Sequence, residues 1–231
     1  MSGRVDEILF GFDRIAWMGS GVLEDTTCLC SQHSVDFVQH HKSFATIDED
    51  TGLGLTFKYP NYVIERLYAD YFVSILQEKA NLPFNSEPVN QAILALAQHG
   101  NPQPFFDQVS FVLKGLLSNR DAVRFHEGAL KGIFVSLLHQ QQFYYIHSEY
   151  ESSRQYVDIF LETIKGYKPN YEIGIELKYV KKGDKRNINA LLDEAETQLR
   201  EYMTTYKFNL RANVKAFVVV AQGYKLTWRA V

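Results

Sequence analysis

The chain has 231 residues, of which 46% are hydrophobic, and it contains 14 tyrosines and 16 phenylalanines. This composition excludes a mostly disordered chain and is sufficient for one large domain or two small ones. The formal net charge is -3, whereas a general nucleic-acid binder is usually basic. The charge therefore counts against tight non-specific DNA binding, although it leaves room for a local basic patch.

The N-terminal region carries the two cysteines, Cys28 and Cys30, which are too close to build a disulfide framework. With His33, His40 and His41 they also have poor spacing for a tetrahedral zinc site, so we interpret them as a small apolar pair and exposed histidines. The first residues lack the apolar segment of a secretory signal, and no apolar stretch approaches the ~18 residues of a membrane span. We expect a cytoplasmic protein with no membrane partner.

Helical periodicity dominates the first half of the chain. Apolar residues recur at three- and four-residue steps, and Gly-Asn-Pro at 100–102 separates two of the predicted segments. Residues 48–54 have turn composition, and residues 53–59 predict a short strand. The predicted helices are residues 4–17, a segment that begins at residue 62, and residues 87–99 and 104–117. Residues 1–117 are therefore expected to form a mostly helical region.

The pattern changes at residue 118, where Ser-Asn-Arg-Asp resembles the start of a capped helix. A helix is predicted from about residue 121 to 139. Three strands, a long helix and two more strands follow, at residues 143–150, 155–163, 171–180, 188–206, 214–221 and 224–229. The order α-β-β-β-α-β-β predicts an α/β domain over residues 118–231.

Three charged residues lie within two of the predicted strands. Asp158 is surrounded by apolar residues, while Glu176 and Lys178 share one strand face and Ile175 and Leu177 share the other. A charge inside an apolar strand is costly unless it is paired or binds a metal. Two carboxylates can hold a hard cation such as Mg²⁺, and a neighbouring lysine can orient a nucleophile or neutralise a transition state. This chemistry suits phosphodiester hydrolysis.

The order of elements, with Asp158 on the second strand and Glu176-Leu177-Lys178 on the third, resembles the PD-(D/E)XK nuclease superfamily over residues 121–231. The resemblance implies a restriction-endonuclease-like core of order α-β-β-β-α-β and metal-dependent hydrolysis of nucleic acid, with DNA as the leading hypothesis. It implies that Asp158 and Glu176 bind Mg²⁺ or Mn²⁺, that the backbone carbonyl of Leu177 completes the metal shell, and that Lys178 assists the attacking water.

Further residues extend the resemblance. Glu127 lies where many members place a third metal-binding acid, and Gln198 and Tyr202 form a Gln-x-x-x-Tyr motif of the RecB-like branch, which implies that they position the substrate. Lys181 and Lys182 follow the third strand and are candidates for phosphate contacts. The alternatives are a surface acid for Glu127, an exposed Gln198, a core Tyr202 and a solvated loop for the lysines.

Residues 54–61, Gly-Leu-Thr-Phe-Lys-Tyr-Pro-Asn, and the helical segment 62–79 are similar to the end of the AAA-ATPase-like region in bacterial proteins with a C-terminal PD-(D/E)XK domain. The sequence has no Gly-x-x-x-x-Gly-Lys-[Ser/Thr] loop, so ATP binding is not expected. The helical region is expected to be either an accessory module or a module that binds a protein partner. A weaker hypothesis is that it binds DNA as a winged-helix-like unit.

One departure from the family pattern favours a different function. Members often have Gly-Arg-x-Asp at the first acid, whereas residues 153–158 read Ser-Arg-Gln-Tyr-Val-Asp, with Arg154 displaced. This departure and the acidic charge favour a catalytically inactive module that binds nucleic acid or protein, whereas the intact Asp158, Glu176 and Lys178 favour catalysis. The choice between DNA and RNA, single and double strands, and exo- and endonuclease action stays open, as does the oligomeric state.

Overall fold

The computed structural model of the chain describes residues 46–50, 55–58, 66–67, 69–70, 73–74, 86–117, 125–152, 155–180, 186–205, 211 and 213–231. The helix predicted at residues 4–17, the cysteines and histidines between residues 28 and 41, and the capping segment 118–121 lie outside the described residues. So do Lys181 and Lys182. The described residues between 66 and 74 are helical, in agreement with the helix predicted from residue 62.

Two short strands precede the helices. The strand β2 (Leu55–Lys58) lies within the strand predicted at residues 53–59, and it pairs antiparallel with β1 (Thr46–Asp50) in a two-stranded sheet. The prediction of a turn from residue 48 was wrong for residues 48–50, which belong to β1. Acidic residues are poor strand formers, and backbone pairing with β2 overrides their local preference.

Three helices precede the main sheet. The helices α4 (Ser86–His99) and α5 (Gln103–Leu116) each lie within one residue of their predicted bounds. The helix α6 (Glu127–Leu138) begins later than the predicted residue 121, because the extended backbone of His126 (φ −142°, ψ 177°) marks its N-cap. The Nδ1 atom of His126 accepts a hydrogen bond from the Ala129 N–H at 3.3 Å, which satisfies one of the free donors of the first turn.

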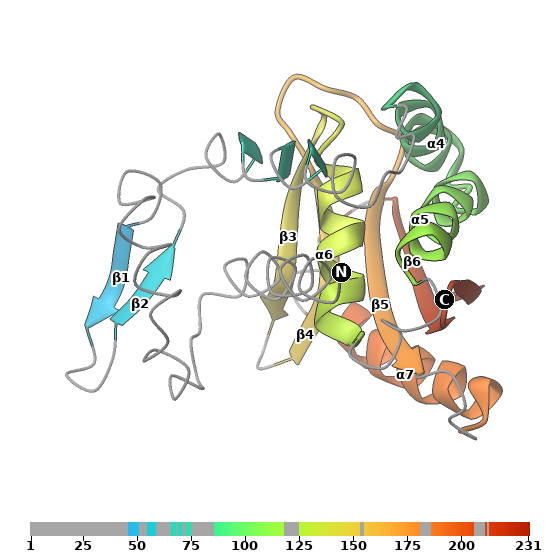
Figure 1. Cartoon of the computed structure of the whole chain (residues 1–231). Helices are drawn as coiled ribbons and strands as arrows, with labels where there is room; N and C mark the ends of the chain where they lie inside the picture. Colours follow the sequence, from blue (N-terminus) through green and yellow to red (C-terminus); the bar gives the residue numbers. More distant parts are fainter. Residues whose placement is uncertain are drawn as a thin grey trace, which may run out of the picture.

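The main sheet has five strands in the order β3-β4-β5-β6-β7 (Figure 1). Only β5 and β6 run parallel, because the helix α7 (Ile188–Met203) connects them as a crossover. The order of helices and strands confirms the α-β-β-β-α-β-β prediction and a restriction-endonuclease-like core. The strands are β3 (Tyr144–Ser152), β4 (Gln155–Thr163), β5 (Glu172–Val180), β6 (Val214–Gln222) and β7 (Lys225–Ala230).

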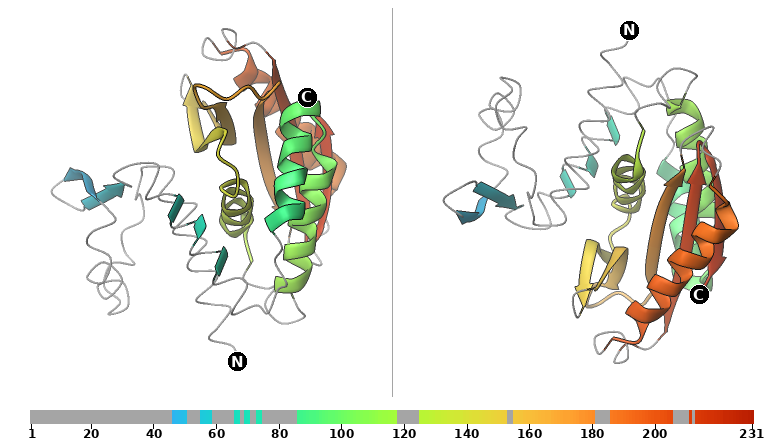
Figure 2. Two further views of the ribbon diagram at one scale, coloured as in Figure 1. Left: turned by 90° about the horizontal axis from the view of Figure 1, so that it is seen from above. Right: turned by 90° about the horizontal axis from the view of Figure 1, so that it is seen from below.

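Helices cover both faces of this sheet (Figure 2). The helices α4, α5 and α6 pack on one face, and α7 packs on the other. Successive residues of a strand point to opposite faces, so β6 contributes Phe217 and Val219 to the first core and Val218 and Val220 to the second. The near-continuous apolar sequence of β6 follows from its burial on both faces.

An aromatic cluster joins α5 to the sheet. The ring of Phe106 lies 5.9 Å from that of Phe134 on α6, 6.3 Å from Phe217 on β6 and 5.8 Å from Trp228 on β7, measured between centroids. The core of the described residues therefore crosses residue 117, where the sequence predicts a division between regions 1–117 and 118–231. That division stays a prediction for the chain as a whole.

Among the described residues, none of the helices combines the length and the hydropathy that a membrane span requires.

Candidate active site

The candidate site lies where β4 and β5 part. The paired ladder covers residues 159–161 of β4 and residues 173–175 of β5. Asp158 and Glu176 are the first residues beyond it on their strands. In an extended strand, residues two apart present their N–H groups to the same edge. The N–H groups of Leu177 and Tyr179 therefore both face the opening between the two strands.

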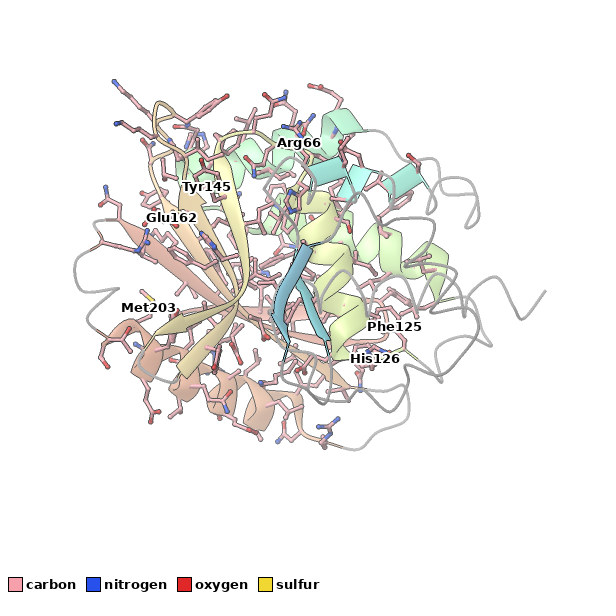
Figure 3. All side chains as sticks on the ribbon, turned by 90° about the vertical axis from the view of Figure 1, so that its left-hand side faces the viewer. Arg66, Phe125, His126, Tyr145, Glu162 and Met203 are labelled. Carbon is pink, nitrogen blue, oxygen red and sulfur yellow. The ribbon has the colours of Figure 1, made fainter. Side chains whose placement is uncertain are left out.

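Two carboxylates accept hydrogen bonds from these N–H groups. The Leu177 N–H donates to Oδ2 of Asp158 at 2.8 Å, and the Tyr179 N–H donates to Oε2 of Glu127 at 3.1 Å. Phe125 and His126 lie at the start of α6 (Figure 3), and Glu127 follows in the first turn. The buried ring of Phe125 lies 4.9 Å from that of Tyr179. The start of α6, β4 and β5 are thus joined through Asp158 and Glu127.

Two lysines complete the group. The Nζ atom of Lys178 lies 3.0 Å from Oε1 of Glu176, and the Nζ atom of Lys131 lies 2.9 Å from Oδ1 of Asp158. Lys131 is one turn after Glu127 on α6, and its side chain is only 8% exposed, against 23% for that of Lys178. With three carboxylates and two ammonium groups ionised, the formal charge of the group is −1.

The pKa shifts show that these side chains interact. Burial, followed by repulsion from Asp158, raises the pKa of Glu176 from 4.5 to about 7. The same two causes, in the same order, raise the pKa of Glu127. Burial alone would lower the pKa of Lys178, but attraction to Glu176, and then to Glu127 and Asp158, raises it overall. Lys178 therefore carries its positive charge at neutral pH.

The donor chemistry fits a hard divalent cation. Mg²⁺ needs only one or two protein carboxylates, because it keeps several of its waters. Asp158 and Glu176 provide two carboxylates whose mutual repulsion a cation relieves. In the described part of the chain, no group of three or more acidic, histidine or cysteine side chains is already arranged around a metal position. The residues therefore fit a metal held by two protein carboxylates and water.

The structure brings together Asp158, Glu176, Lys178 and Glu127, as the sequence predicts, although their catalytic and metal-binding roles stay predictions. Gln198 and Tyr202 do not share an environment: Gln198 is exposed, whereas Tyr202 is buried in the core between α7 and the sheet. The position of Tyr202 is the one expected of a core residue. A substrate-positioning role for this pair stays a prediction.

Lys131 is the residue of this group that the sequence analysis missed. Every residue of α6 from Ala129 to Leu138 is buried, so Lys131 is a charge within an apolar helix. The cost of burying an unpaired charge, which drew attention to Asp158, applies to Lys131 equally. Its spacing of four residues from Glu127 was a second available signal, because residues so spaced lie on one face of a helix.

The fold, with acids at the end of the β4–β5 ladder, agrees with the restriction-endonuclease-like core expected from the sequence. A family model described as the PD-(D/E)XK nuclease superfamily matches residues 125–230, so this part of the chain is similar to domains of that superfamily. No curated protein sequence matches the chain. The matched range includes Glu127, Asp158, Glu176 and Lys178. Placement in the RecB-like branch and next to an AAA-ATPase-like region stays a prediction.

Proposed function

We propose that residues 125–230 hydrolyse phosphodiester bonds in DNA with a divalent metal ion. The observation that carries this proposal is the meeting of three carboxylates, the buried Glu176 and the partly buried Asp158 and Glu127, with a charged lysine where β4 and β5 part. Charges kept together in a buried place are costly, and such clusters are concentrated at functional sites. The superfamily match gives this cluster a reaction class, nuclease-type phosphodiester hydrolysis.

In this proposal Asp158 and Glu176 hold Mg²⁺ or Mn²⁺, with the Leu177 backbone carbonyl as a further ligand and Glu127 as an additional acid. When bound, the metal lowers the pKa of a coordinated water and neutralises charge on the phosphate. Lys178, held beside Glu176 at 3.0 Å, orients the attacking water and stabilises the negative charge that develops in the transition state.

Substrate contacts are proposed on both sides of these residues. Lys181 and Lys182 follow β5 directly after the Glu176–Lys178 segment, a position from which lysines can contact backbone phosphates. On α7, the exposed Gln198 is the residue that substrate can reach, whereas the buried Tyr202 supports the position of the helix. The helical region before residue 117 is proposed to bind a protein partner.

The test is cleavage of labelled single- and double-stranded DNA and RNA with Mg²⁺ or Mn²⁺. Asp158→Asn is compared with wild type, and the matched control is Asp193→Asn, whose side chain on α7 is 68% exposed. The proposal predicts metal-dependent cleavage of DNA by wild type and control, and a loss of at least about 100-fold in Asp158→Asn, typical of removed electrostatic stabilisation. Equal cleavage by Asp158→Asn, or no cleavage of any substrate, would overturn it.

A second candidate function is a non-catalytic module that binds nucleic acid or protein. One observation favours it: Asp158 and Glu127 both accept hydrogen bonds from N–H groups of β5, so they already have a structural use without a metal. Calorimetric titration with Mn²⁺ separates the two candidates. A nuclease binds Mn²⁺ through Asp158 and Glu176, whereas a module that keeps these acids only as structural partners gives no binding signal.

A further inference from the structure

Lys131 has a position that hydrogen bonding and packing alone do not require. It is flanked on α6 by Leu130 and Gly132, which are buried, and its ammonium group lies 2.9 Å from Oδ1 of Asp158. An apolar side chain of similar length would suit this surrounding core better, because burying an ammonium group is strongly unfavourable without a paired anion. The Lys131–Asp158 ion pair is therefore a feature of the site rather than of the core.

The carboxylate of Asp158 has a different partner on each of its two oxygens. Oδ2 accepts the hydrogen bond from the Leu177 N–H, which fixes the orientation of the carboxylate beside β5. Oδ1 forms the ion pair with the ammonium group of Lys131. A divalent cation that takes Asp158 as a ligand competes with an ammonium group for this carboxylate, because both are cations that require the same negative charge.

We propose that Lys131 is a built-in counter-cation that competes with the divalent metal for Asp158 and so sets the metal concentration at which the site fills. This inference rests on the proposed function, since it assumes that Asp158 is a metal ligand. In the metal-free protein, Lys131 offsets the repulsion between Asp158 and its neighbours Glu176 and Glu127. Metal binding then requires the ammonium group to leave Asp158.

A second partner for the displaced ammonium group is present on the same helix. Glu127 precedes Lys131 by four residues and lies on the same face of α6. The two charges already interact: Lys131 acts to lower the pKa of Glu127, which burial and Asp158 raise overall. With the metal held by Asp158 and Glu176, Glu127 remains the nearby anion that offsets the charge of the displaced ammonium group.

The test is calorimetric titration of the full chain with Mn²⁺ in the absence of substrate. Lys131→Met removes the competing charge, Lys131→Arg retains it, and Lys215→Met is the matched control, since Lys215 is exposed beside the ring of Tyr171 on another part of the sheet. We expect Lys131→Met to bind Mn²⁺ at least about tenfold more tightly than wild type, which corresponds to about 1.4 kcal/mol. Lys131→Arg and Lys215→Met should stay within about threefold of wild type.

Circular dichroism establishes whether each variant is folded. If Lys131→Met does not fold, Lys131→Gln is used in its place, and the same gain in Mn²⁺ affinity is expected. If wild type cleaves DNA but binds Mn²⁺ no more weakly than Lys131→Met, the competition between Lys131 and the metal is refuted. The proposed function is not affected by that result. Lys131 would then only support Asp158. Absence of both Mn²⁺ binding and cleavage in wild type and Lys131→Met would overturn the proposed function, and this inference with it.

Discussion

Phe106 offers a direct test of whether α4 and α5 belong to the same folded unit as the superfamily domain. Its side chain is 1% exposed, and its ring contacts Phe134, Phe217 and Trp228, which lie on three different elements. Phe106→Ala removes the ring from this cluster and leaves a cavity. Truncations of this kind typically cost about 3–5 kcal/mol. In urea this loss lowers the midpoint of unfolding by about 1 to 2 M.

The assay is urea unfolding followed by far-ultraviolet circular dichroism and by tryptophan fluorescence, to which Trp228, beside the mutated position, contributes. The matched control is Phe111→Ala, on the same helix, where the side chain is 51% exposed and the expected loss is below about 1 kcal/mol. Equal and small losses for Phe106→Ala and Phe111→Ala would refute the reasoning, because α5 would then contribute little to the core that it shares with the sheet.

Two further predictions concern pH. Burial raises the pKa of Glu176 from 4.5 to about 7, so the folded wild type holds a proton more tightly than the unfolded chain and loses stability as pH rises between these values. Between pH 4 and pH 8, the free energy of unfolding of Glu176→Gln should rise by up to about 3 kcal/mol relative to that of wild type. If urea unfolding gives the same difference at every pH, the raised pKa of Glu176 is wrong. Burial would also raise the pKa of Glu162, but hydrogen bonds from Arg211 and His147 lower it overall. As pH falls from 5 to 3, wild type should therefore lose more stability than Glu162→Gln. The difference should be less than about 1 kcal/mol, because Glu162 is partly exposed. Stability curves of the two proteins that run parallel over this range would contradict the prediction.

The elements of the main sheet could be predicted from the sequence because each strand carries a local pattern that matches its burial. The apolar run of β6 shows this directly, since its residues 216–221 are all buried. The start of α6 could not be predicted, because its N-cap is His126 rather than one of the residues that most often cap helices. The strand β1 was missed because its stability comes from pairing with β2 rather than from its acidic sequence.

The site was predictable where a charge interrupts an apolar strand, as at Asp158 and Glu176. The parting of β4 and β5 was not, since it depends on how far two strands pair rather than on the composition of either. The burial of Lys131 could have been inferred from its apolar helix, but its partner could not, because only the packing of α6 on the sheet places its ammonium group on Asp158. The burial of Tyr202 likewise follows from the way α7 packs on the sheet.

The most direct test of the central claim is the rate at which Lys178→Met cleaves DNA with saturating Mn²⁺, measured on both single- and double-stranded substrates. Lys215→Met, which removes an exposed lysine from β6, is the control. The account predicts that Lys178→Met loses at least about 100-fold in rate, while its calorimetric affinity for Mn²⁺ stays within about tenfold of wild type and the control cleaves normally. Cleavage by Lys178→Met at the wild-type rate would contradict the assignment of this site as a nuclease centre.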